Sequence, residues 1–153
     1  MLAANGAYAT LNDGLGANQK LVGNGGNSTF NVDQVFNQGV GPETVVANGG
    51  GNTVNIGQGN ADLTIHLGSG GYNVINVNGS QPTLTIDGEG KTDIVHFAEA
   101  SDTFASAIIT HHAATTTASA YTTVQFTTTE DVTLIGAPHH AVTFAGDPSI
   151  HYI

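Results

Sequence analysis

Apolar and polar residues alternate along much of the chain, in short runs that end near glycine or asparagine. The runs "TVNI" (53–56), "LTIHL" (63–67) and "LTIDG" (84–88) follow this two-residue alternation, which is typical of half-buried β-strands, and "YNVINV" (72–77) is also read as a strand. Their β-branched residues favour strands further. Apolar residues show no 3.6-residue spacing, and the chain is rich in glycine, asparagine and threonine. The pattern therefore predicts an all-β protein with almost no helix.

The strand-like runs are separated by glycine-rich turns that repeat. "NGGGNTVNI" (48–56), "GSGGYNVIN" (68–76) and "GEGKTDIVH" (88–96) begin 20 residues apart, and "GNGGNSTFN" (23–31) begins 25 residues before the first of them. Second strands are expected between the turns, at residues 44–47, 63–67 and 83–86. Each unit thus contains turn, strand, turn and strand, which is the length of one two-stranded coil of a parallel β-solenoid with about 20 residues per coil.

Narrow coils of this kind explain the composition of the turns. Glycine is favoured there because it allows positive φ and close approach to the next coil, and asparagine tolerates the left-handed conformation next best. Asparagines at equivalent positions can also form a hydrogen-bonded ladder. The five additional residues of the first interval are assigned to an inserted loop at 33–43, which contains a proline. We expect the inward-facing core residues to include Val54, Ile56, Val74, Val77, Ile94 and Phe97.

The four turns resemble the nonapeptide G-G-x-G-x-D-x-U-x of the RTX, or hemolysin-type, repeat family, over about residues 21–97. The resemblance implies a right-handed parallel β-roll in which calcium ions are held between successive turns by aspartate carboxylates and backbone carbonyls. At the aspartate position this chain has Ser28, Thr53 and Asn73, and only the last turn retains an acid, Asp93.

Calcium binding is therefore predicted to be weak or absent. Calcium needs carboxylate charge for tight binding, and one acid in four ligand positions does not supply a full ladder of sites. Two alternatives stay open: a single weak calcium site near Asp87, Glu89 and Asp93, or a solvated acidic face near Lys91. Without calcium, we expect backbone ladders, inward Val, Ile and Leu, and rows of Asn and Thr to stabilise the stack.

The repeat ends at Phe97. Residues 98–153 contain strand candidates separated by turn signals such as "GAPHH" and "GDPS", and these strands are predicted to be antiparallel. The segment resembles the capping segments that close many RTX rolls, and a cap is expected because the end of a solenoid exposes unpaired backbone. The chain thus divides into an N-terminal strand or cap segment (1–20), a β-roll (21–97) and an antiparallel β cap (98–153).

Two pairs of adjacent histidines lie in the C-terminal segment, namely His111 with His112 and His139 with His140. Neighbours in a strand point to opposite faces, so one pair does not chelate a single ion easily, but one member of each pair could meet across a sheet. The alternatives are a transition-metal site or ordinary strand histidines that are exposed, hydrogen-bonded or part of a pH-sensitive interface.

Charge and composition exclude several function classes. The chain has 12 acidic residues against Lys20 and Lys91, and its formal charge of −10 disfavours nucleic acid and anionic membranes as partners. It has no cysteine, no apolar run long enough to insert into a membrane, and no G-x-S-x-G elbow for a nucleophile. We therefore expect a protein without catalytic activity.

Two functions remain. One is a non-catalytic extracellular structural protein whose coils self-associate through β edges into homo-oligomers or filaments of a surface layer, fibre or biofilm matrix. It is favoured by the scarcity of charge, since residues 44–61 carry none. The other is a calcium-binding accessory module of a larger secreted polysaccharide-active enzyme or adhesin, with a polysaccharide as its partner. The resemblance implies a location outside the cell or on its surface, reached by type I secretion.

Overall fold

The computed structural model describes the chain at residues 1–12, 18–32, 42–58, 62–79, 83–88, 92–99, 102–126, 131–136 and 140–153. In these ranges the chain forms fifteen β-strands and no helix, so no helix that could cross a membrane is found there. The predicted all-β class is confirmed.

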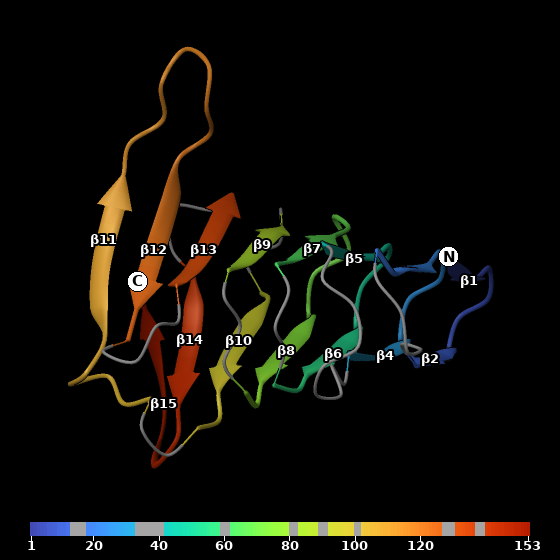
Figure 1. Ribbon diagram of the computed structural model, residues 1–153, viewed down its shortest axis with the longest axis horizontal. Helices are drawn as coiled ribbons and strands as arrows, with labels where there is room; N and C mark the ends of the chain where they lie inside the picture. The colour runs from blue at the N-terminus through green and yellow to red at the C-terminus, as the bar shows by residue number, and fades with distance from the viewer. Residues whose placement is uncertain are drawn as a thin grey trace.

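The strands form two sheets, named here sheet A and sheet B, and the first ten strands alternate between them along the chain (Figure 1). In spatial order, sheet A contains β1 (Leu2–Ala4), β3 (Lys20–Gly23), β5 (Glu43–Ala47), β7 (Leu63–Leu67), β9 (Leu84–Gly88), β13 (Asp131–Gly136), β12 (Tyr121–Gln125) and β11 (Ile108–His112). From the same end, sheet B contains β2 (Thr10–Asn12), β4 (Thr29–Val32), β6 (Thr53–Ile56), β8 (Val74–Val77), β10 (Ile94–Phe97), β14 (Ala141–Phe144) and β15 (Asp147–Tyr152).

Each coil contributes one strand to each sheet, and equivalent strands of successive coils pair in parallel. The parallel ladders run from β1 to β13 in sheet A and from β2 to β14 in sheet B. Antiparallel pairs occur only at the C-terminal end of the described structure, where β12 pairs with β13 and β11, and β15 pairs with β14. The predicted parallel β-solenoid with antiparallel C-terminal strands is confirmed, with coils of about 21 residues.

The parallel ladders extend past both ends of residues 21–97. At the N-terminal end, "ANGAYATLN" (4–12) aligns with "GNGGNSTFN" (23–31), and β1 and β2 pair in parallel with β3 and β4. Alanine replaces glycine at two of these positions, Ala4 at the end of β1 and Ala7 in the turn, which hides the repeat in the sequence. At the C-terminal end, β13 and β14 form a further coil, separated from β10 by the segment that contains β11 and β12. Of the predicted loop at 33–43, residues 33–41 lie outside the described residues, and Glu43 begins β5.

The core lies between the two sheets. Of the predicted core residues, Val54, Ile56, Val77 and Phe97 are buried, and this part of the prediction is confirmed. At its C-terminal end the core is filled by phenylalanines, with the rings of Phe97 and Phe126 5.1 Å apart.

Val74 and Ile94 were predicted wrongly, because they face outward and are only partly buried. Their neighbours Ile75 and Val95 are buried instead. The error comes from one turn: residues 68–73 connect β7 to β8, whereas the shorter segment 48–52 connects β5 to β6. The additional residue shifts the register by one, which exchanges the inward and outward faces.

Close packing of the coils explains the glycines of the turns. A Cβ atom added at Gly50 would lie 2.1 Å from the carbonyl oxygen of Gly70, and one added at Gly70 would lie 2.2 Å from the backbone nitrogen of Gly50. Both contacts are with backbone, which cannot move aside without separating the coils.

The register of β8 gives a direct test. Ile75→Ala should lower the free energy of unfolding by about 2–5 kcal/mol, because it leaves a cavity between the sheets. Val74→Ala, the matched control on the outer face, should cost much less. Urea unfolding followed by circular dichroism measures both values, and a larger loss for Val74→Ala than for Ile75→Ala would contradict the observed register.

Candidate functional site

The residues at the calcium-ligand position of the repeat lie in one column along the solenoid, named here the polar column. It consists of Ser28, Asn52, Asn73 and Asp93, which directly precede β4, β6, β8 and β10. The first three are buried. Thr53 was predicted at this position of the second coil, but Thr53 pairs with Thr29, so the residue equivalent to Ser28 is Asn52. The interval between these two coils is therefore 24 residues rather than 25.

Each side chain of the polar column accepts a hydrogen bond from the backbone of the preceding coil. Ser28 N–H donates to Asn52 Oδ1 at 3.0 Å, Asn52 N–H to Asn73 Oδ1 at 3.0 Å, and Asn73 N–H to Asp93 Oδ1 at 2.9 Å. The backbone N–H of Ala9 donates to Ser28 Oγ at 3.3 Å. The polar column therefore links five successive coils at one turn.

The side chains of the column also satisfy carbonyl oxygens of their own turns. Asn52 Nδ2 donates to the carbonyl oxygens of Asn48 at 3.3 Å and Gly49 at 3.1 Å, and Ser28 Oγ donates to that of Gly25 at 3.3 Å. Removing one such partner inside the protein would leave a buried polar group unsatisfied, at a cost of about 1–3 kcal/mol. In this column, amide and hydroxyl groups bond the turn carbonyls that the RTX resemblance assigns to calcium.

Asp93 differs from the other members of the column. Its Oδ1 accepts hydrogen bonds from both the backbone N–H and the Nδ2 of Asn73, at 2.9 and 3.0 Å. Its Oδ2 is buried and has no hydrogen-bond partner in the described structure. Burial raises the pKa of the Asp93 carboxyl above its ordinary value, and the hydrogen bonds from Asn73 oppose this shift.

The polar column ends at a small cavity. Asp93, His140 and Gly88 line it, together with apolar side chains from both sheets, and its volume is about 20 Å³. His140 is the next position of the column, because Ile94 pairs with Ala141. A cavity of this size holds about one water molecule. The site thus combines a carboxylate and an imidazole at the wall of a one-water cavity.

The structure separates the acids of the predicted calcium site. Asp87 lies on the outer face of sheet A, with Oδ2 3.3 Å from His66 Nδ1, whereas Asp93 lies at a turn before sheet B. Both members of the His66–Asp87 pair are about half exposed, so the pair contributes little to stability. Glu89 and Lys91 lie outside the described residues. Among the residues that the structure describes, no group of three or more metal-ligating side chains is found.

The histidine pairs also lie apart. On β11, His111 Nδ1 is 3.1 Å from Thr122 Oγ1, and the ring of His112 stacks on Tyr121 with centroids 4.2 Å apart. His140 belongs to the cavity beside sheet B, and His139 lies outside the described residues. The described histidines of β11 thus have local partners on the neighbouring strand β12.

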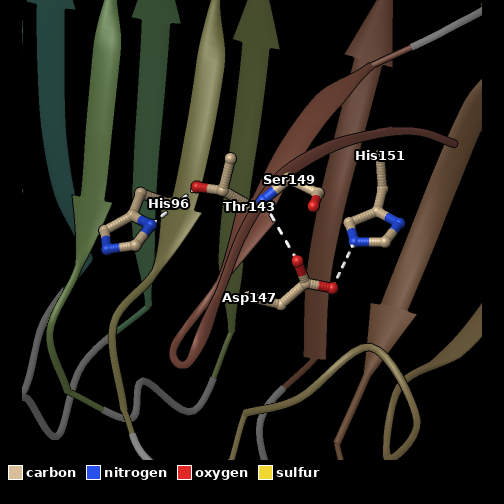
Figure 2. Close-up of polar contacts among 5 residues, drawn as sticks. All are labelled: His96, Thr143, Asp147, Ser149 and His151. Atoms are coloured by element: carbon tan, nitrogen blue, oxygen red, sulfur yellow. Dashed lines mark hydrogen bonds and ion pairs between the residues drawn. The ribbon is translucent and has the colours of Figure 1, made fainter.

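Two further histidines have polar partners that the sequence did not reveal. Figure 2 shows His96 Nδ1 beside Thr143 Oγ1 at 2.6 Å, and His151 Nε2 beside Asp147 Oδ2 at 2.9 Å. The backbone N–H of Ser149 donates to Asp147 Oδ1 at 3.0 Å. The hydrogen bond with His151, followed by those from Ser149, lowers the pKa of Asp147. The contact of Asp147 with Ser149 and His151 could have been inferred from their spacing, since residues 147, 149 and 151 share one face of a strand.

Both sheets carry regular polar rows on their outer faces. On sheet B, the asparagine row consists of Asn12, Asn31, Asn55 and Asn76, and the Nδ2 of each of the last three donates to the Oδ1 of the preceding coil at 2.7–2.8 Å. On sheet A, the strand register aligns a threonine row across six neighbouring strands, formed by Thr44, Thr64, Thr85, Thr133, Thr123 and Thr110. The expectation of Asn and Thr rows along the faces is confirmed.

A second column lies beside the polar column, at the outer margin of the turns, and is named here the turn edge. It consists of Tyr8, Asn27, Gly51 and Tyr72, whose φ angles are 62°, 56°, 72° and 60°. Equivalent bonds define it: Tyr8 N–H donates to Gly26 O, Asn27 N–H to Gly50 O and Gly51 N–H to Gly71 O. The left-handed conformation suits glycine and asparagine, but it costs other residues about 1–2 kcal/mol.

No protein-family model matches this chain, and comparisons with curated proteins and with solved structures found no similar protein. The RTX resemblance therefore rests on the residues of the turns.

The carboxyl of Asp93 predicts a pH effect on stability. Because its pKa is raised in the folded state above the ordinary 3.8, the unfolded chain releases this proton first as pH rises, and folding becomes less favourable across that window. Asp93→Asn keeps the Oδ1 acceptor and removes the charge. Relative to Asp93→Asn, the wild-type protein should lose stability as pH rises from about 3 to 7.

Urea unfolding of both proteins at several pH values measures this difference. Asp87→Asn removes one acid from the outer face of sheet A and serves as the control for net charge. A difference between wild type and Asp93→Asn that stays constant with pH, or one that grows in favour of the wild type, would contradict the assignment.

Proposed function

We propose that this protein is a non-catalytic structural β-solenoid, located outside the cell or on its surface, that self-assembles into a fibre, layer or biofilm matrix. The observation that supports it is the pair of regular rows on the two outer faces. The threonine row presents one hydroxyl and one methyl group per strand, repeated at the strand spacing of about 4.7–4.9 Å. The asparagine row is pre-ordered by its own hydrogen bonds.

Such faces favour contact between copies of the chain. Identical short side chains at a constant spacing interdigitate well when two sheets stack, and asparagine rows add hydrogen bonds. Proteins normally prevent this contact with charged residues, which are scarce here. On sheet A, the His66–Asp87 pair lies beside the threonine row. The faces therefore carry little electrostatic protection against association.

Net charge opposes assembly at a distance. Copies with a formal charge of −10 repel one another at low ionic strength, and the repulsion is screened over about 10 Å at 0.1 M salt. Assembly in this proposal therefore increases with salt as well as with protein concentration.

A second function, a calcium-binding accessory module of a larger secreted polysaccharide-active enzyme or adhesin, is favoured by one atom. Asp93 Oδ2 is a buried carboxylate oxygen without a hydrogen-bond partner in the described structure, at the position where the resembled repeats bind calcium. In this function the cavity beside Asp93 takes a cation, and the solenoid serves as a rigid spacer.

The assembly proposal is tested by size-exclusion chromatography with light scattering, and by electron microscopy, across protein and salt concentrations. The wild type should form large assemblies that grow with salt. A double variant of the threonine row, Thr64→Lys with Thr133→Lys, should remain small, because stacked faces would bring the new charges together.

The control is Thr115→Lys with Thr117→Lys, which adds the same charge in the exposed segment between β11 and β12. This variant should assemble like the wild type, and circular dichroism confirms that each variant is folded. A wild-type protein that stays monomeric at every concentration and salt level would disprove the assembly function.

A further inference from the structure

Two tyrosines project into solvent from the turn edge. Tyr8 is 81% exposed and Tyr72 is 74% exposed, and both have the left-handed backbone conformation. No ring contact and no side-chain hydrogen bond of either tyrosine is found in the described part of the chain. Both side chains thus lie largely in solvent, although each occupies a backbone conformation that disfavours a residue with a side chain of this size.

The other residues of the turn edge show which residue types this backbone conformation prefers. At the two equivalent positions between the tyrosines the chain has Asn27 and Gly51, both suited to positive φ. The backbone N–H of Tyr72 donates to Thr92 Oγ1 at 3.0 Å, a bond that any residue except proline would make there. Exposed residues held in a strained backbone conformation point to a role in binding.

We infer that the turn edge is a binding site for a neutral, extended polysaccharide. Three coil steps separate Tyr8 from Tyr72, which is about 14 Å at the spacing of neighbouring strands. A polysaccharide whose rings advance by about one coil spacing would place its first and fourth rings over the two tyrosines. A phenol ring suits this contact because its face is apolar, its hydroxyl remains in water, and few side-chain torsions are fixed on binding.

The positions between the tyrosines leave room for the polymer. Gly51 has no side chain, the amide of Asn27 lies where a Gly51 side chain would be, and this exposed amide can donate to and accept from sugar hydroxyls. Tyr8, Asn27, Gly51 and Tyr72 carry no charge, whereas the chain as a whole is acidic. An acidic polymer is therefore repelled and a neutral one is not.

This site is separate from the faces that carry the proposed assembly. The turn edge runs along one margin of the solenoid, and the threonine and asparagine rows lie on the strands. Binding is therefore measured at a protein concentration and salt level at which the chain is monomeric. Failure of assembly then leaves this inference intact, and loss of binding leaves assembly intact.

Cellohexaose and chitohexaose are the probes, with polygalacturonate as the acidic comparison. The chain has four tyrosines and no tryptophan, so tyrosine fluorescence reports binding directly, and calorimetry gives the affinity. The wild type should bind at least one of the two neutral hexamers, bind the corresponding dimer at least tenfold more weakly, and not bind polygalacturonate. The affinity for the dimer should be lower because a dimer contacts only one of the two tyrosines.

Tyr8→Asn and Tyr72→Gly replace each tyrosine with a residue type that the turn edge has at its other positions. Each variant should be as stable as the wild type or more stable, since strain is relieved, and each should lose hexamer affinity at least tenfold. Tyr72→Phe should retain binding. Tyr152→Ser, which removes an equally exposed tyrosine from β15, should bind like the wild type.

Three binding results would overturn the inference. They are the absence of binding to both neutral hexamers, equal loss of affinity in Tyr152→Ser and Tyr72→Gly, and equal affinity for dimer and hexamer. A lower stability of Tyr72→Gly would also contradict it, because the tyrosine would then have a structural role.

Discussion

The buried backbone N–H groups at the turns before sheet B are the constraint on which the solenoid depends. A buried N–H needs an acceptor, and each coil must find it in the next coil. Asn52 and Asn73 supply that acceptor and also bond their neighbours with the same amide groups, and Asp93 supplies it at the last described step. A single short polar side chain per coil thus fixes the register between neighbouring coils and provides the acceptor for the buried N–H group of the turn. This arrangement explains how the coils stack although Ser28, Asn52 and Asn73 carry no charge at this position.

The same turns connect stability to the proposed functions. Because Gly50 and Gly70 allow backbones to pack against each other, the coils stack closely and their outer residues align in regular rows. The rows make the faces suited to association, whereas the margin of the turns holds Tyr8 and Tyr72 away from the core. Assembly through faces and polysaccharide binding along the turn edge are therefore compatible in one molecule. Together, the two proposals describe a protein that connects copies of itself to a neutral polymer.

Much of the fold could be predicted from the sequence, because turn glycines and two-residue alternation recur at a nearly constant interval. Single-residue differences between coils could not be resolved in this way. One more residue before β8 exchanged Val74 for Ile75 in the core, and a 24-residue interval put Asn52 rather than Thr53 in the polar column. Contacts between distant segments, such as the approach of His140 to the cavity beside Asp93, depend on the pairing of β14 with β10. No local pattern encodes that pairing.

We infer that hydrogen bonds of the polar column, rather than calcium ions, hold the coils together. Circular dichroism during thermal unfolding, with the protein first in a chelator and then in millimolar calcium, tests it directly. We predict a β-rich spectrum in the chelator and nearly the same melting temperature in both conditions, because Ser28, Asn52 and Asn73 are already satisfied. An unfolded protein in the chelator that folds on addition of calcium would contradict the account, since folding would then be driven by metal binding.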